Sequence, residues 1–114
     1  MLQHRELAAG RWFRFSLVEQ LANVGSEVER ALGWKERGNT EYSMRAVERC
    51  LELLDLTIAD AAHRGRRREL TRVREVLVDY FYADNRYGSS PARWRTYFNA
   101  FTVAARQLGP ALSP

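Results

Sequence analysis

Residues 41–62 read EYSMRAVERCLELLDLTIADAA, and this stretch decides the fold of the chain. Apolar side chains recur in it every three or four residues, which predicts one long amphipathic helix from Glu41 to Ala62. The main apolar stripe consists of Met44, Val47, Leu51, Leu54 and Ile58. Leu53 and Leu56 lie on a second side of the same helix. A helix that is apolar on two sides is buried on both, or it contacts a second chain.

Three further helices are expected around this one. The first follows a capping box formed by Ser16 and Glu19. Its stripe consists of Leu17, Leu21, Val24, Val28, Ala31 and Leu32. The next runs from about Arg66 to Ala83, and its inward residues are Leu70, Val73, Leu77, Tyr80 and Phe81. The last starts at Ser90 and Pro91, and its inner stripe is Trp94, Tyr97, Phe98, Phe101, Ala105 and Leu108.

Short connections between long helices favour antiparallel neighbours. The prediction is therefore an all-α protein, an up-down-up-down four-helix bundle. Its 114 residues form a single domain, 1–114, in which residues 1–15 are an N-terminal arm. The arm alternates arginines with aromatic residues from Arg11 to Phe15. Two interpretations stay open: the aromatics cover one end of the bundle, or the arm grips a partner chain or a nucleic acid.

Two features of the helix that follows Ser16 bear on its packing. Gly25 lies in its middle, where glycine costs about 1 kcal/mol relative to alanine, so close approach of another helix is expected there. The flank of the helix is polar and consists of Gln20, Asn23, Glu27 and Arg30. This flank is either a solvated surface or part of a buried polar network with another helix.

Composition excludes several classes of protein. No apolar run approaches the ~20 residues of a membrane span, and residues 1–10 lack the apolar core of a signal peptide. The single cysteine, Cys50, leaves no intrachain disulfide and is expected to be a small buried hydrophobe. We therefore expect a cytoplasmic protein that does not enter a membrane.

An acidic line runs along the helix predicted for residues 41–62. Glu48, Glu52 and Asp55 repeat at helical spacing, where like charges repel. We expect arginines of the chain, such as Arg45 and Arg49 or residues of the next helix, to compensate them. A divalent metal is the alternative, since hard cations take carboxylates. Glu52 and Asp55 match half of the Glu-x-x-Glu and Glu-x-x-Asp pattern of helical nucleotide pyrophosphohydrolases, but the first half is missing.

No other chemical motif stands out. The chain has no glycine-rich phosphate loop, no zinc spacing and no Glu-x-x-His pair. Asp60 and His63 could place two ligands on one helix face, or form a simple polar C-terminal turn. The sequence therefore predicts no catalytic residue, no cofactor and no metal, and it leans towards a protein that is not an enzyme.

The most basic segment joins the two middle helices. The net charge of +4 divides into −1 over residues 1–57 and +5 over residues 58–114. Four arginines surround the expected helix end at Gly65: Arg64 directly before it, and Arg66, Arg67 and Arg68 after it. The N-terminus of a helix is already positive, so this cluster invites an anion such as a phosphate or a nucleic acid. An exposed turn with solvated arginines is the simpler interpretation.

A homodimer interface is the second candidate site. Val78 and Tyr82 lie off the inward stripe of their helix, as Leu53 and Leu56 do on theirs. A bundle monomer would expose these four residues as an apolar patch, and such patches mark contacts.

Three segments carry a resemblance to known proteins. They are residues 16–28 (SLVEQLANVGSEV), residues 51–60 (LELLDLTIAD) and the aromatic helix after Ser90. Together they resemble small prokaryotic helical proteins that are uncharacterised, a likeness that brings no activity with it. The architecture also resembles HEPN-type helical bundles, whose active members carry an arginine four to six residues before a histidine. Neither His4 nor His63 has such an arginine, so the resemblance implies a non-catalytic relative.

Three functions follow from these features. The first is a non-enzymatic interaction or structural protein that forms a homodimer. The second is an RNA- or DNA-associated module that uses the arginine-rich turn and the aromatic-basic segments. The third is a nucleotide- or metal-dependent hydrolase that uses the acidic line.

Overall fold

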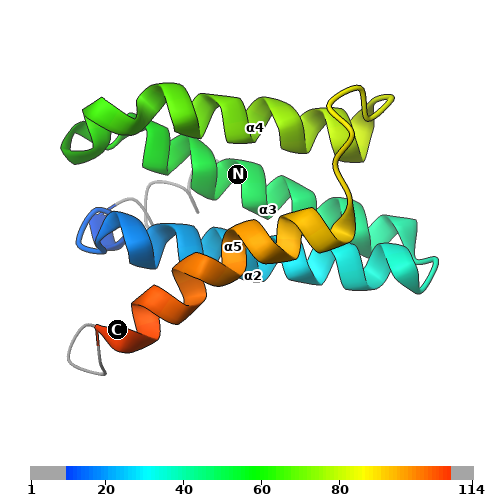
Figure 1. Ribbon diagram of the computed structural model, residues 1–114, viewed down its shortest axis with the longest axis horizontal. Coiled ribbons are helices and arrows are strands. Elements are labelled where there is room, and N and C mark those ends of the chain that lie inside the picture. Colours follow the sequence, from blue (N-terminus) through cyan, green and yellow to red (C-terminus); the bar gives the residue numbers. More distant parts are fainter. Residues whose placement is uncertain (1–9, 109–114) are drawn as a thin grey trace.

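The computed structural model describes residues 10–108, and they fold into four main helices without any strand (Figure 1). The helices are α2 (Leu17–Glu36), α3 (Thr40–Ala59), α4 (Arg67–Tyr82) and α5 (Pro91–Gln107). A short 3-10 helix, η1 (Ala61–Arg66), joins α3 to α4. The chain direction alternates from one main helix to the next (Figure 1), which confirms the predicted all-α four-helix bundle.

The helix α2 is the centre of the arrangement. It packs against α3 on one side and against α5 on another, while α4 packs against α3. Figure 1 shows α5 crossing in front of α2 at an angle, whereas α2, α3 and α4 run nearly side by side.

The helix starts form where the sequence placed them. Ser16 and Glu19 make both bonds of the predicted capping box. The Asn39 side chain accepts a hydrogen bond from the backbone of Tyr42 and caps α3. Ser90 caps α5, with proline at its first position. Each cap satisfies a backbone N–H that would otherwise lack a partner in the first helical turn.

Gly25 lies where α5 crosses α2. A Cβ atom at this position would be 2.7 Å from the Cβ atom of Phe98. No side chain fits in that space, so only glycine lets the two helices approach this closely. The predicted close approach of another helix at Gly25 is confirmed.

The end of α3 differs from the prediction. The sequence predicted a helix that reaches about Ala62 and is terminated by Gly65. In the structure α3 ends at Ala59. Asp60 adopts an extended backbone (φ −67°, ψ 116°), and its carboxylate accepts a hydrogen bond from the backbone N–H of Ala62. This local bond offers the backbone an alternative to the helix, as is typical of aspartate at turns.

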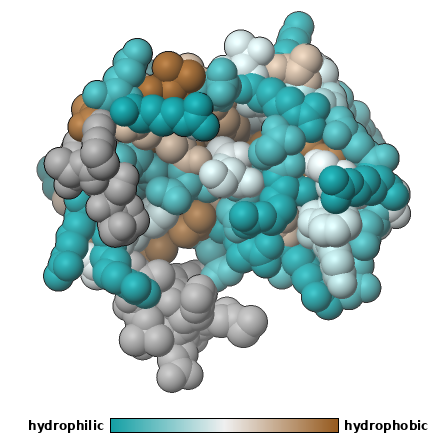
Figure 2. Space-filling model, turned by 90° about the horizontal axis from the view of Figure 1, so that it is seen from below, coloured by the Kyte–Doolittle hydropathy of each residue, from teal (hydrophilic) through white to brown (hydrophobic). Residues whose placement is uncertain are grey.

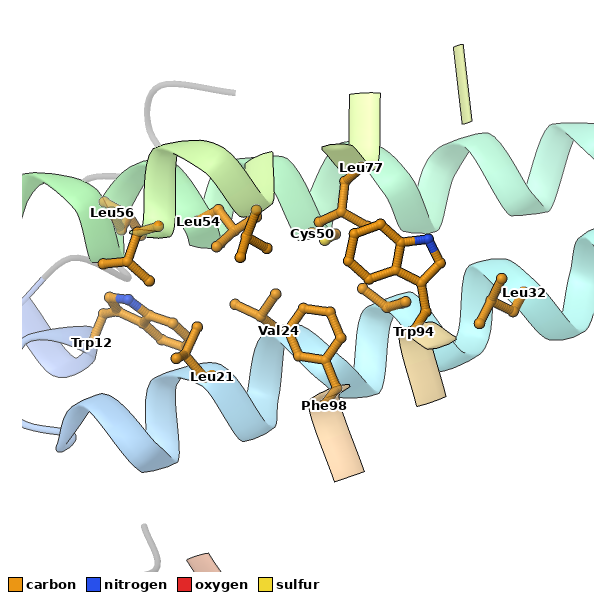
Figure 3. Packing of buried hydrophobic residues seen from close by; sticks show 13 residues of the cluster. Trp12, Leu21, Val24, Leu32, Cys50, Leu54, Leu56, Leu77, Trp94 and Phe98 are labelled. Atoms are coloured by element: carbon orange, nitrogen blue, oxygen red, sulfur yellow. The ribbon is translucent and has the colours of Figure 1, made fainter. Parts of the chain in front are cut away.

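The core runs along the bundle between the helices (Figure 3). It consists of Trp12, Leu21, Val24, Val28, Leu32, Cys50, Leu54, Leu56, Leu70, Val73, Leu77, Trp94 and Phe98. The predicted inward residues of α2 and α4 belong to it or pack against it, apart from Ala31, which belongs to a small second cluster. Cys50 is buried, as predicted.

The predicted stripe of α5 is correct only in its first half. Trp94 and Phe98 are buried, and Tyr97 and Phe101 pack partly against the core. Leu108 is 45% exposed and is not an inward residue. The reason is the crossing angle, because the end of α5 diverges from the bundle in Figure 1.

Candidate functional site

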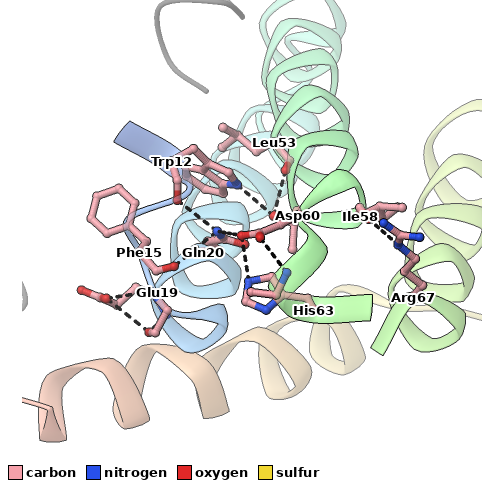
Figure 4. A network of polar contacts seen from close by, with 12 residues as sticks. Trp12, Phe15, Glu19, Gln20, Leu53, Ile58, Asp60, His63 and Arg67 are labelled. Atoms are coloured by element: carbon pink, nitrogen blue, oxygen red, sulfur yellow. Dashed lines mark hydrogen bonds and ion pairs between the residues drawn. The ribbon is translucent and has the colours of Figure 1, made fainter. Parts of the chain in front are cut away.

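A buried polar network lies at the end of the bundle where α3 ends (Figure 4). Its centre is Gln20, which is fully buried. The Nε2 atom of Gln20 donates to the backbone oxygen of Trp12 at 3.0 Å and to Asp60 Oδ2 at 3.1 Å. It also lies 3.4 Å from the backbone oxygen of Phe15. Gln20 of the α2 flank is therefore part of a buried polar network, with the segment before α2 and with the turn after α3.

The segment before α2 is held to the bundle by this network and by its own aromatic side chain. Trp12 is 6% exposed, and its Nε1 atom donates to Thr57 Oγ1 at 3.0 Å. Phe15 packs partly against the core, whereas Phe13 is 45% exposed. Trp12 and Phe15 thus cover one end of the bundle, which confirms the first interpretation of the aromatics. Residues 1–9 of the predicted arm lie outside the described residues.

Asp60 and His63 face each other in the turn that follows α3. The distance from His63 Nε2 to Asp60 Oδ2 is 3.3 Å, and both side chains are about nine-tenths buried. They do not share a helix face, because α3 has already ended. Among residues 10–108, no three His, Cys, Asp or Glu side chains gather closely enough to hold a metal ion.

The four arginines of the predicted anion site have different surroundings. Arg66 forms an ion pair with Glu69 at 2.8 Å, and Arg67 donates from Nε to the backbone oxygen of Ile58 at 3.0 Å. Arg64 and Arg68 are exposed and form no ion pair with any described residue. The cluster is therefore partly neutralised, with two arginines left to solvent.

The acidic line on α3 is matched by an arginine at one position. Asp55 pairs with Arg74 of α4 at 2.8 Å, as expected for a residue of the next helix. Arg45 and Arg49 do not compensate the line, since they pair with Glu41 and Glu27 instead. Glu48 and Glu52 form no ion pair within the described part of the chain.

Glu27 is the most buried carboxylate with arginine partners. Its side chain is 9% exposed and pairs with Arg49 of α3 through Oε2 at 2.8 Å and with Arg30 through Oε1. Glu27 thus belongs to the buried alternative for the α2 flank, while Asn23 and Arg30 are exposed. Burial raises the pKa of the nearby Cys50 thiol to about 12, and the charge of Glu27 adds to this effect.

The loop between α4 and α5 is fixed by side chains that cap its backbone. The buried carboxylate of Asp79 accepts hydrogen bonds from the backbone N–H groups of Arg86 and Tyr87 at 2.9 and 3.0 Å. The side chain of Asn85 accepts a hydrogen bond from the Ser89 N–H at 2.8 Å and donates one to the Ser89 backbone oxygen at 2.9 Å. These contacts hold Tyr87 at the surface beside α4.

A small pocket of about 290 Å³ lies between α4, this loop and the start of α5. Its lining residues are Arg72, Val76, Tyr87, Ser89, Arg93, Trp94 and Tyr97. Sequence reasoning did not find it, because its residues are far apart in the chain. The only local signals are Tyr87, next to Gly88, and Arg93 in the first turn of α5.

Most residues of the aromatic-basic segment at the start of α5 are buried or bonded to other residues of the chain. Arg95 forms ion pairs with Glu29 and Glu36 at 2.9 and 3.1 Å, and Trp94 is buried. Tyr97 donates its hydroxyl to Glu69 at 3.1 Å. Of this group, Arg93 remains without an ion pair among the described residues.

The residues of the predicted dimer interface differ in exposure. Leu56 is 8% exposed and belongs to the core of the single chain, and Leu53 packs partly against that core. Val78 is half-buried, and Tyr82 is 49% exposed. The second apolar side of α3 is therefore largely covered by the chain itself, with Trp12 next to Leu56 in Figure 3.

A shallow groove of about 990 Å³ lies between α2 and α5. Its rim carries Arg95 and Glu29, which bind each other. Figure 2 shows that the underside of the molecule is largely hydrophilic, with apolar surface only in small, separate areas. The apolar surface on this face is therefore not continuous.

Comparisons with protein-family models, with curated proteins and with solved structures find no match to this chain. Within the described residues, no helix has both the length and the apolar character needed to cross a membrane.

Proposed function

We propose that this chain is a non-enzymatic helical module that binds single-stranded nucleic acid at the end of the bundle where α2 and α4 begin. The observation that carries the proposal is the docking of residues 10–15. Trp12 and Gln20 hold this segment beside Asp60, so Arg11 and Arg14 lie at the same end as the arginine-rich turn.

The acidic residues at this end are already occupied. Glu19 bonds to Ser16, Glu69 pairs with Arg66, and Asp60 is buried against Gln20. Four exposed arginines at this end form no side-chain hydrogen bond or ion pair with a described residue, namely Arg11, Arg14, Arg64 and Arg68; Arg67 is also exposed but donates to the backbone oxygen of Ile58. Phosphates that contact such arginines release counterions, which favours binding without sequence preference.

The test is fluorescence anisotropy with labelled single-stranded RNA and DNA at ~50 and ~200 mM salt. Affinity is expected to fall steeply with salt. The double variant Arg64→Gln/Arg68→Gln should weaken binding and lower the salt slope by about 1.4, the value for two lost phosphate contacts on a single strand.

The matched control is Arg37→Gln/Arg45→Gln, which removes the same charge next to the other end of α3. This variant should bind almost as the parent does. Absence of binding at the lower salt, or equal losses in the two double variants, would contradict the proposal.

We also infer a homodimer through α4 as a second candidate. Tyr82 and the half-buried Val78 lie one helical turn apart on α4, and exposed aromatic surface of this kind favours contacts. Light scattering at micromolar concentration should give twice the mass of the chain. Tyr82→Glu should restore the monomer, whereas Tyr42→Glu, at an equally exposed tyrosine, should not. A monomer mass for the parent chain would remove this candidate.

A further inference from the structure

We propose that the pocket between α4, the loop at residues 83–90 and the start of α5 binds a nucleoside phosphate. Its phosphate would contact Arg72 and Arg93, and its base would lie against the aromatic wall. This site is separate from the arginines proposed above to contact nucleic acid, and it does not depend on them.

Charge is the first reason. Two arginines line the pocket, and no carboxylate does. The guanidinium of Arg72 lies over the ring of Tyr87, 4.7 Å from its centroid. Arg93 has only a long contact of 3.4 Å, from Nη1 to the backbone oxygen of Gly88. Neither arginine forms an ion pair with a described residue, so both keep N–H groups for a ligand with several acceptor oxygens.

The nearby acidic groups do not cancel this charge. Glu69 is engaged by Arg66 and by the hydroxyl of Tyr97. Asp79 is engaged by the backbone of the loop. Glu75 and Asp84 are exposed and do not line the pocket. The pocket thus favours an anion.

The aromatic residues are the second reason. Tyr87, Trp94 and Tyr97 form much of the wall, and flat rings suit a flat base. The buried Nε1 atom of Trp94 has no hydrogen-bond partner among the described residues. The volume of about 290 Å³ lies at the lower end of small-molecule sites, which suits a single nucleotide rather than a protein segment.

Rigidity is the third reason. Asp79 and Asn85 fix the loop that carries Tyr87 through four hydrogen bonds with distances of 2.8–3.0 Å. The stacked pair Arg72–Tyr87 is therefore in place before a ligand arrives. A site that is already ordered loses little conformational entropy on binding.

The ligand can be a free nucleotide or the phosphorylated end of a strand. Calorimetric titration with uridine monophosphate, uridine and inorganic phosphate tests the shared chemistry. The monophosphate should bind best, phosphate should compete with it, and uridine should bind poorly. Tetranucleotides with and without a 5′-phosphate then separate the two sources. Stronger binding of the phosphorylated strand than of the monophosphate identifies a strand end, and the reverse order identifies a free nucleotide.

Variants locate the site. Arg72→Gln and Arg93→Gln should each weaken binding of the monophosphate about tenfold, the effect of losing a hydrogen bond to a charged group. Arg86→Gln, in the same loop but outside the pocket, should leave it unchanged. The indole N–H resonance of Trp94, assigned with Trp94→Phe, should shift on titration.

Two results would overturn the inference: no binding of the monophosphate at millimolar concentration, or equal affinity in Arg72→Gln, Arg93→Gln and Arg86→Gln. Thermal melts show whether each variant is folded. A long single strand that still binds through Arg64 and Arg68 would leave the proposed function intact while this site fails.

Discussion

Gly25 of α2 and Phe98 of α5 meet where the two helices cross, with space for a hydrogen atom but not for a methyl group. The crossing point sets how Trp94 and Phe98 enter the core, since both residues come from the same face of α5. The packing of the last helix thus depends on one small residue in the first main helix.

Gly25→Ala should destabilise the protein by about 1–2 kcal/mol, although alanine is the better helix former. The new methyl group would displace Phe98, and overpacking costs more than the propensity of alanine returns. Gly33→Ala is the control, because this glycine is also in α2 and a Cβ atom there would meet nothing within 4 Å. It should stabilise by up to about 1 kcal/mol. Urea unfolding measures both, and equal effects would contradict the packing argument.

Gln20→Ala should loosen the segment before α2. It removes the donor to the backbone oxygen of Trp12 and to Asp60, and buried groups that lose a partner cost about 1–3 kcal/mol each. Tryptic cleavage after Arg14 should therefore accelerate about tenfold or more. Asn23→Ala removes a bond from an exposed amide of the same helix and should leave the cleavage rate unchanged. If both variants are cleaved alike, the network does not hold the segment.

The ion pairs of Glu27 should respond asymmetrically to mutation. Glu27→Gln leaves two arginines that are half-exposed and can be hydrated, so it should cost about 1 kcal/mol or less. The double variant Arg30→Gln/Arg49→Gln leaves the buried carboxylate without its cations and should cost about 2–3 kcal/mol. Chemical denaturation of the parent and the two variants at neutral pH tests this difference in cost. If the ion-pair energies were simply additive, Glu27→Gln and the double variant would lose the same stability, because both remove the same two ion pairs.

Cys50 should react slowly with thiol reagents in the folded protein. Burial raises the pKa of its thiol to about 12, so the thiolate forms more easily in the unfolded chain. The folded state then holds the proton more tightly, and the free energy of unfolding falls as pH rises above the unfolded pKa. Between pH 8 and 10 the parent should lose about 1.5 kcal/mol more than Cys50→Ala. The variant keeps every tyrosine, so tyrosine titration affects both proteins alike. Identical pH profiles would contradict the raised pKa.

The sequence predicted the helices well because their signals are local. Capping residues mark the starts of α2, α3 and α5 at Ser16, Asn39 and Ser90, and apolar periodicity marks the inner faces; α4 begins without a side-chain cap. The end of α3 was misplaced because the Asp60 carboxylate accepts a local hydrogen bond from the Ala62 N–H and a second one from Gln20 of α2, which the local pattern does not reveal. The crossing angle of α5, which exposes Leu108, has no signature in its own sequence either.

The candidate sites were harder to predict for the same reason. A run such as residues 64–68 is visible in the sequence, but its ion pairs are not: Arg66 pairs with Glu69, whereas Arg68 has no ion pair with a described residue. Leu56 is buried in the same cluster as Trp12, a residue far away in the chain. The pocket needs three elements at once, so only the folded chain reveals it.

The position of α2 between α3 and α5 also predicts the order of folding. The loop from α2 to α3 is three residues long, Arg37–Asn39, so these helices can pair early at little entropic cost. The docking of α5 closes a much larger loop and is expected after the rate-limiting barrier. Leu21→Ala should then slow folding in stopped-flow experiments, whereas Phe98→Ala should chiefly accelerate unfolding. The helix α5, which completes the core, would therefore dock last in folding and detach first in unfolding.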